Sequence, residues 1–320
     1  MRKLAIGFIA LAFVLTGCAV SGEQAPAPET KASVQLPDKL TKGDLGVPAI
    51  EVYIVEDEKS KRMDIESYVQ GVVAGEMKND WPMEALRAQA ILARTFTLKF
   101  LCEKESKYRG ADISTDIEEA QAYDAADVNE RIKQAVQSTG GMVLSANGSL
   151  PYAWFHAHSG GMTALAKEGL GYANAEPAYT MIAKGHESAK APDDAKTWSA
   201  AFSKKEVIAA LKKAGVTVGS LTALVVERRG KSGRATNITV NGDKTVSAPE
   251  LRIALNSTKM RSTLLTSLKV TGETVLMAGK GYGHGVGMPQ WGAYGLAEEG
   301  KTGEEIVLAY FDNVEIVKAW

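Results

Sequence analysis

A single glutamate at the end of an apolar helical face is the residue best placed in this sequence for acid–base chemistry. Ile65, Val69, Val72 and Val73 recur at the spacing of one helical face, and Glu76 continues that face. The helix dipole and partial burial both disfavour negative charge at a helix C-terminus, so both raise the pKa of the Glu76 carboxyl. A raised pKa is what a general acid needs near neutral pH. The alternative is an ordinary solvated or ion-paired glutamate.

A second helix is expected directly after the first, joined to it by a tight turn. Pro82 suits the first turn of a helix, where its missing N–H has no intrahelical partner to lose. Alanines at positions 85, 88, 90 and 93 allow close packing on a neighbour. Arg87 and Arg94 are seven residues apart and lie on one side of this helix. The sequence therefore predicts a helical pair that positions Glu76.

Two histidines close together, His156 and His158, raise the question of a metal site. Residues two apart on a strand point the same way, but zinc needs a third and usually a fourth ligand. The other candidate ligands, His186, His284 and Cys102, are far away in the sequence. We therefore expect neither a metal nor another cofactor.

Two glycine-rich stretches are typical of backbone that approaches a ligand or another strand closely. One is the turn that follows the histidines, at 159–161. The other has six glycines between positions 279 and 292, interleaved with Tyr282, His284, Gln290 and Trp291. Flat aromatic faces suit sugar rings or bases, but neither a βαβ unit nor a GxGxxG register supports nucleotide binding. A structural turn that packs against the core is the alternative.

The composition bounds the class of protein. The chain has 320 residues and a formal net charge of −1, so nothing electrostatic favours nucleic acid as a partner. An apolar content of 45% supports a sizeable core. The two cysteines are Cys18 and Cys102. We expect Cys102, near the end of the second helix, to be a packing residue.

The N-terminus has the pattern of an export signal. A basic start at 1–3 precedes an apolar run at 4–15 that is short for a membrane span. The sequence at 15–18 ends in Cys18 and resembles the lipobox of bacterial lipoproteins, which implies cleavage before Cys18 and lipid on that residue. The alternative is an ordinary signal peptide with an incidental cysteine. Residues 22–36 read as a flexible tether. We expect a signal peptide at 1–17, the lipidated cysteine and tether at 18–48, and a catalytic domain at 49–320.

The expected order of elements is typical of an α+β fold. We predict one mixed domain with helices packed on antiparallel β-sheet, with room for a small inserted subdomain around 162–270. A hairpin is predicted from 142–145 and 152–155, with Asn147 and Gly148 at its turn. Ser203 and Glu206 form a capping box at the start of a helix over 203–214. Further strands are predicted over 50–55, 222–229, 236–240, 265–270 and 314–317, further helices over 127–138, 248–255 and 303–310, and a charged turn over 56–61.

Several blocks of residues, taken together and in order, resemble the stage II sporulation protein D family. These blocks are 71–77, 82–90 with 93–95, 155–156 with 159–161, 232–234, 251–252 with 261–264, and 281–288. They extend over roughly 50–320. The resemblance implies a peptidoglycan lytic transglycosylase. Such an enzyme cleaves between N-acetylmuramic acid and N-acetylglucosamine, leaves a 1,6-anhydro end and prefers strands without stem peptides.

The resemblance also implies roles for particular residues. Glu76 corresponds to the catalytic glutamate, and one carboxyl suffices for a reaction that needs no water. We expect Arg94 to steer Glu76 indirectly or to hold substrate. A groove is predicted, with Glu76 and Arg94 as one wall and the two glycine-rich stretches as the other. The predicted substrate-binding residues are Arg94, His156, Ser159, Gly160, Tyr282, His284 and Gln290.

The same resemblance sets the expected surroundings. The partners would be peptidoglycan glycan strands, a lipid anchor to the outer face of the cytoplasmic membrane, and an amidase of the sporulation wall machinery. Some relatives bind zinc through Cys and His, but this chain has only Cys102 beyond the signal, so that site is expected to be absent. His158 stands where the family often has Thr or Cys. The alternative function is a glycan-binding protein or amidase enhancer that does not cleave.

Overall fold

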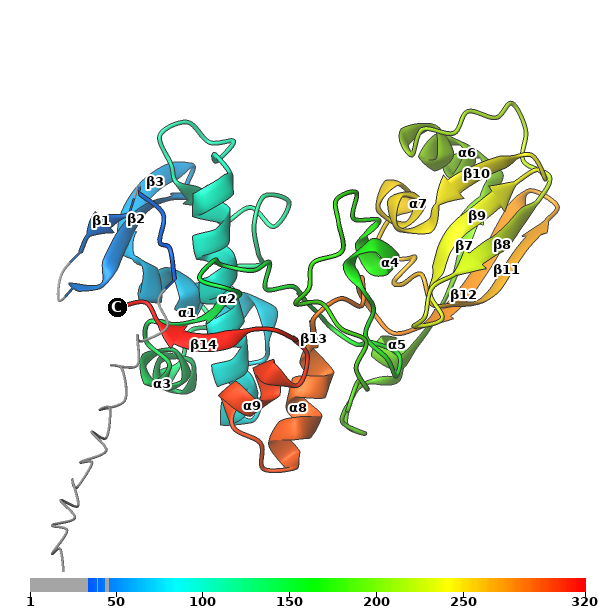
Figure 1. The fold of residues 1–320 in the computed structure, drawn as a ribbon. Helices are drawn as coiled ribbons and strands as arrows, with labels where there is room; N and C mark the ends of the chain where they lie inside the picture. Colours follow the sequence, from blue (N-terminus) through cyan, green and yellow to red (C-terminus); the bar gives the residue numbers. More distant parts are fainter. Residues whose placement is uncertain (1–33, 39, 44–45) are drawn as a thin grey trace, which may run out of the picture. The chain divides into compact units, whose positions relative to one another are not determined.

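The computed structural model describes residues 34–38, 40–43 and 46–320, which adopt a mixed α+β fold (Figure 1). The export signal and Cys18 lie outside these described residues. The described residues form one compact unit. Among the described helices, none combines the length and the apolar character that a membrane crossing requires.

A small sheet opens the described chain. Its central strand β2 carries the buried Ile50 and Val52 and pairs antiparallel with β3, with Val52 opposite Lys61. Residues 59–61 were predicted as part of a charged turn, but the turn ends at Glu58, and the lysines are exposed on the strand β3. The strands are β1 (Thr41–Lys42), β2 (Pro48–Ile54), β3 (Lys59–Asp64) and β4 (Ile113–Ser114), the last parallel to β2.

The predicted helical pair is confirmed as α1 (Ile65–Glu76) and α2 (Met83–Glu103). Asp64 caps α1, because its Oδ1 accepts a hydrogen bond from the Ser67 N–H at 2.8 Å. Helix α2 is buried along most of its length and contacts α1, β5 and three more helices (Figure 1). Those helices are α3 (Glu130–Ser138), α8 (Gln290–Glu298) and α9 (Gly303–Leu308).

The predicted hairpin of 142–145 with 152–155 is wrong. The turn exists, since Asn147 and Gly148 have φ of 51° and 80° and Ala146 pairs with Ser149. Beyond that bridge the strands separate. Strand β5 (Met142–Ser145) pairs antiparallel with the C-terminal β14 (Glu315–Lys318), and β6 (Phe155–His156) pairs parallel with β13 (Met288–Pro289). A short turn therefore did not fix the partners of its flanking strands.

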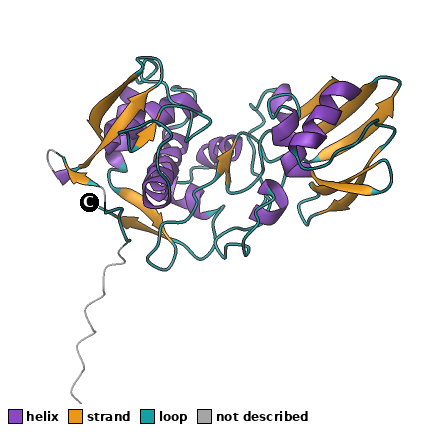
Figure 2. Ribbon diagram, turned by 90° about the horizontal axis from the view of Figure 1, so that it is seen from above, coloured by secondary structure: helices purple, strands orange, loops and turns teal. Residues whose placement is uncertain are grey.

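A second hydrophobic cluster is formed by side chains from residues 198–277. This part of the chain contains both strands and helices, drawn in orange and purple in Figure 2. Its two sheets have the strand orders β11-β12-β7 and β10-β9-β8, all antiparallel. The predicted capping box of Ser203 and Glu206 is confirmed at the start of α6. The predicted subdomain around 162–270 begins earlier than this cluster, and two short helices precede the first strand. The elements are α4 (Ala166–Leu170), α5 (Asp193–Lys196), β7 (Thr197–Ser203), α6 (Lys204–Lys213), β8 (Leu224–Arg229), β9 (Ala235–Val240), β10 (Lys244–Ser247), α7 (Ala248–Leu255), β11 (Leu265–Thr271) and β12 (Thr274–Lys280).

Candidate active site

The Glu76 carboxyl is held by two hydrogen bonds at the end of α1. Its Oε1 accepts from the Ala122 N–H at 2.9 Å, and its Oε2 accepts from the Gln290 Nε2 at 3.3 Å. Burial raises the pKa of Glu76 above its usual range, while the hydrogen bonds from Ala122 and Gln290 oppose that rise. The net direction is the one expected from the sequence. The side chain is partly exposed, so a substrate oxygen can reach it.

Two glycines of α1 make the first of these hydrogen bonds geometrically available. A Cβ on Gly71 would lie 2.2 Å from the Tyr123 ring, and one on Gly75 would lie 2.6 Å from the Tyr123 backbone nitrogen. Since neither glycine has a side chain, the segment around Ala122 packs directly on the helix, and the Asp124 N–H donates to the Gly71 carbonyl at 2.9 Å. The Ala122 amide was not predicted as part of the site. The spacing of four between the glycines is the signal that could have indicated a close approach here.

Gln290 brings the second glycine-rich stretch to Glu76. It is the first residue of α8, only 7% exposed, and its Nε2 also donates to the Glu76 carbonyl oxygen at 3.1 Å. The glycine-rich stretch runs into a helix that was not predicted from the sequence, because α8 begins at Gln290. That helix start is what points the amide at Glu76.

The two predicted loops lie side by side. His158 and Tyr282 exchange backbone hydrogen bonds of 3.0 and 2.8 Å, and the Trp291 N–H donates to the Ala157 carbonyl at 3.0 Å. Together with the Gln290 contacts, these bonds place both loops and the Glu76 end of α1 in one connected region. Tyr282 is partly exposed there, with the Arg261 guanidinium 4.9 Å from its ring centroid.

Arg94 is not part of this region, and its predicted position in the groove wall is corrected. Its side chain is fully buried and pairs with Glu66, with Nη2 2.5 Å from Glu66 Oε2, and its Nη1 donates to the Met142 carbonyl at 2.9 Å. Glu66 and Glu76 are ten residues apart in α1, or about 15 Å along the axis. The spacing along α2 indicated correctly that Arg94 faces α1. The acid that it contacts is Glu66, at the opposite end of α1 from Glu76.

His156 was predicted to bind substrate, but its side chain is buried. This side chain is 5% exposed, and its Nδ1 lies 3.2 Å from the Val286 carbonyl oxygen. His284 lies beside it, with ring centroids 5.5 Å apart, and its Nδ1 accepts from the Val286 N–H at 3.0 Å. Burial holds the pKa of both imidazoles well below their usual range. In this structure the two imidazoles contact the backbone of Val286 and stabilise its loop.

The polar groups of Ser159 also form hydrogen bonds within the protein. It is fully buried, its N–H donates to Glu187 Oε1 at 2.8 Å, and its hydroxyl donates to the same oxygen. Direct substrate contact from Ser159 is therefore not available in this conformation. Gly160, which follows it, is partly exposed with φ of 75°. A Cβ there would lie 2.8 Å from the Leu264 side chain, so the turn requires glycine.

An aromatic cluster lies next to Gln290. Trp81, at the turn between α1 and α2, packs on Trp291 and Tyr294 with ring centroids 4.5 and 5.2 Å away. Trp81 is nearly buried, whereas Trp291 and Tyr294 are partly exposed. Exposed aromatic faces beside an acid are suited to packing against a sugar ring. Of this cluster, only Trp291 was singled out from the sequence.

The two histidines considered as metal ligands face different neighbours. His156 contacts Val286 and His284, whereas His158 lies 3.5 Å from Glu187 and accepts from the Gly160 N–H at 2.9 Å. Within the ranges that the structure describes, no three His, Cys, Asp or Glu side chains are grouped as they would be around a metal ion.

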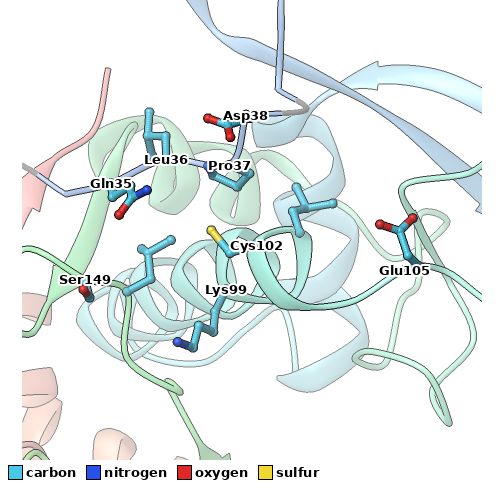
Figure 3. A pocket seen from close by; sticks show the side chains of 10 residues that line it. Gln35, Leu36, Pro37, Asp38, Lys99, Cys102, Glu105 and Ser149 are labelled. Atoms are coloured by element: carbon cyan, nitrogen blue, oxygen red, sulfur yellow. The ribbon is translucent and has the colours of Figure 1, made fainter.

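A separate cavity of about 380 Å³ lies at the far end of α2 (Figure 3). Cys102 lines it, together with the 35–38 segment, and is exposed there, so its predicted packing role is wrong. None of the predicted substrate-binding residues lines this cavity.

Comparison with known proteins agrees with the motifs. A family model described as "Stage II sporulation protein" matches residues 56–145, and a model of a domain of unknown function matches 152–287. The stage II sporulation protein D of Bacillus amyloliquefaciens is 31% identical over 294 residues, covering 85% of this chain and 79% of that protein. The Bacillus subtilis protein of the same name is 29% identical over 319 residues, with 95% and 88% covered. An amidase enhancer of Bacillus subtilis is 28% identical over 291 residues, which is 78% of this chain but 40% of that protein.

Proposed function

The chain belongs to the stage II sporulation protein D family, and from this membership and the surroundings of Glu76 we propose that it is a peptidoglycan lytic transglycosylase. The observation that carries the proposal is a single, partly buried carboxyl with a raised pKa, held by the Ala122 and Gln290 amides at the edge of an aromatic cluster.

The proposed reaction needs one group that acts first as an acid and then as a base. Protonated Glu76 donates its proton to the oxygen that bridges N-acetylmuramic acid and N-acetylglucosamine, and the bond from that oxygen to C1 breaks. The C6 hydroxyl of the same muramic acid closes on C1, and the Glu76 carboxylate removes the hydroxyl proton. One C–O bond breaks and one forms, the proton returns to Glu76, and no water is consumed.

The surroundings of Glu76 suit both halves of this cycle. Burial raises the pKa of Glu76 and so favours the protonated carboxyl that the first step needs. In the second step the two amide donors stabilise the carboxylate, because hydrogen bonds to a charged acceptor are the stronger kind. A glycosidase that uses water ordinarily needs a second carboxylate. In the described part of the chain, the groups that donate hydrogen bonds to the Glu76 carboxyl are amides.

The setting follows from the family and the N-terminal sequence. We propose that the protein is held by lipid on Cys18 at the outer face of the cytoplasmic membrane and acts in sporulation or engulfment wall remodelling. An amidase would supply its substrate by removing stem peptides, so an amidase of the same machinery is the proposed partner.

The amidase enhancer among the relatives favours a second candidate function. A protein of that kind would bind glycan and stimulate an amidase without cleaving the strand. The two functions differ in their products, because only transglycosylation leaves a 1,6-anhydro end.

The test is digestion of amidase-treated and untreated sacculi with the purified full chain, read by mass spectrometry. We expect 1,6-anhydro ends from amidase-treated material with the wild type, and a loss of about 10²–10⁴-fold in Glu76→Gln. Glu118→Gln, an equal change at an exposed acid, is the matched control and should retain activity. Undiminished cleavage by Glu76→Gln would refute the assignment of the acid, and amidase stimulation without anhydro ends would favour the second function.

A further inference from the structure

A cavity of about 390 Å³ lies beside the Gly160 turn and has no role in the acid–base chemistry at Glu76. Its size is within the range of small-ligand sites. Two lysines, Lys196 and Lys280, and His158 line it, along with Gly160 and Gly161. Gly161 has φ of 117° and open space around it, so the backbone on that side is accessible.

The two lysines come from neighbouring segments at one edge of a sheet. Thr197 pairs with Lys280 across β7 and β12, and the Gly281 N–H donates to the Lys196 carbonyl at 2.8 Å. Lys196 Nζ donates to the Ala189 carbonyl at 3.1 Å and lies 3.5 Å from a fully exposed carboxylate of Asp193. Lys280 is exposed, and within the described ranges its ammonium forms no ion pair. The cavity therefore has at least one ammonium available to a ligand and a second that is weakly paired.

Glu187 is the acid that lines the cavity, and its carboxylate offsets part of the positive charge of the lysines. Glu187 Oε1 accepts from both the N–H and the hydroxyl of Ser159 and lies 3.5 Å from His158 Nδ1. The His158 Nδ1 accepts from the Gly160 N–H at 2.9 Å, which leaves Nε2 as the protonated nitrogen and a donor. Burial lowers the pKa of His158, the charge of Glu187 opposes that change, and the charge of Lys196 adds to it. Two ammonium groups and an imidazole N–H are donors that recognise a carboxylate.

A short chain of contacts connects this cavity to Glu76. Gln290 donates to Glu76, and the next residue, Trp291, donates its N–H to the Ala157 carbonyl beside His158. The Trp291 carbonyl accepts from the N–H of Ser188, which lines the cavity, at 3.0 Å. The cavity and Glu76 thus belong to one hydrogen-bonded region, and a polymeric substrate is the kind of ligand that can contact both.

From this arrangement we infer that Lys196 and Lys280 form a subsite for a carboxylate carried by the glycan strand, namely the lactyl carboxylate of N-acetylmuramic acid. The inference rests on the proposed substrate. The lactyl group ends in a free carboxylate only where the stem peptide has been removed, because otherwise it forms an amide. The subsite would thus distinguish stripped strands from strands that still carry peptides. A stem peptide also ends in a carboxylate, and the experiment separates these two sources.

The test is equilibrium binding of the full chain, carrying Glu76→Gln to prevent turnover, to short glycan strands of one defined length. Four probes are compared: stripped strands, the same strands with lactyl carboxyls converted to methylamides, peptide-bearing strands, and chitin oligosaccharides, which lack the lactyl group. The added substitutions are Lys280→Gln and the pair Lys196→Gln with Lys280→Gln. Lys269→Gln and the pair Lys205→Gln with Lys269→Gln remove equal charge at exposed positions and are the matched controls.

We expect stripped strands to bind most tightly, about 5-fold weaker binding in Lys280→Gln, and about 25-fold weaker binding in the double variant. The control variants and the uncharged probes should show little change. Equal affinity for stripped and methylamidated strands would overturn the inference, as would lysine-dependent binding of peptide-bearing strands alone. This binding result can be distinguished from the result of the enzyme proposal, because cleavage is measured with the chain in which Glu76 is intact. Lysine-dependent binding without anhydro products would leave the subsite standing, and anhydro products without lysine dependence would leave only the enzyme.

Discussion

Replacing Arg94 should lower the free energy of unfolding without changing the turnover of the molecules that remain folded. The Arg94 guanidinium lies between α1, α3 and β5, and makes three contacts of 2.5 to 3.2 Å with the Glu66 carboxylate. It also donates to the Met142 carbonyl, while Glu66 accepts from the Gly141 N–H at 2.9 Å. Arg94→Ala leaves a mostly buried carboxylate with one donor and creates a cavity.

The expected loss in the free energy of unfolding is about 3–5 kcal/mol, the usual cost of removing one partner of a buried ion pair. That is a large part of the roughly 5–15 kcal/mol that holds a domain together, so Arg94→Lys is the milder companion variant. A lysine keeps the charge but cannot donate to Glu66 and Met142 in the same planar arrangement. We therefore expect an intermediate loss. Denaturant unfolding measures stability, and anhydro-end formation is normalised to the folded fraction.

A double-mutant cycle with Glu66→Ala distinguishes the structural role from a catalytic one. The double variant should be less destabilised than the sum of the single variants, with a coupling of about 0.5–3 kcal/mol. Turnover for each folded molecule should stay within a few-fold of the wild type. If Arg94→Lys keeps its stability but loses turnover by orders of magnitude, Arg94 acts on the substrate or on Glu76 and the structural account is wrong.

The remaining predictions concern the packing and titration of the site. Gly75→Ala should lower the free energy of unfolding by about 1–3 kcal/mol, because its Cβ would displace the segment that donates to Glu76. Gly219 has open space around it, so Gly219→Ala should leave the thermal unfolding temperature unchanged. Gln290→Leu removes a donor that lowers the pKa of Glu76, so the alkaline limb of kcat/KM should move to higher pH, and a shift to lower pH would contradict this. His156 has a lowered pKa in the folded protein, so its stabilising contribution is present above its unfolded pKa of about 6.5 and is lost as pH falls, by about 1.4 kcal/mol for each unit. Between pH 6.5 and 5.5 the unfolded histidine goes from half to mostly protonated, so in His156→Asn the loss of unfolding free energy over this interval should be smaller by about 1 kcal/mol. An unchanged loss would show that His156 does not titrate on unfolding.

Signals that act within a few residues allowed correct predictions from the sequence. The Asp64 cap, the Ser203–Glu206 box and the end of α1 at Glu76 depend on hydrogen bonds or periodicity over one or two turns. The same local logic predicted the raised pKa of Glu76, because an apolar helical face implies burial. The choice of partner for a strand is not local. Strand β5 pairs with β14, about 170 residues later in the chain, and nothing near the Asn147–Gly148 turn encodes that.

Arg94 illustrates a different limit. Its side of α2 could be derived from spacing, but which of two acids on α1 it meets depends on how the helices are offset along their axes. That offset depends on tertiary packing, because α2 also contacts α3, α8 and α9, whose places in space the sequence does not show. Burial of His156 and Ser159 has the same origin, since a polar residue in a glycine-rich turn can face either solvent or the next loop.

The most direct test of the single-acid mechanism is cleavage of stripped glycan strands by the full chain in water enriched in ¹⁸O, with mass spectrometry of the new ends. The C6 hydroxyl supplies the oxygen in an intramolecular closure, so the account predicts anhydro ends that contain no ¹⁸O. Reducing ends that carry one ¹⁸O would show that water attacks C1. That result would contradict the mechanism even if Glu76 proved essential.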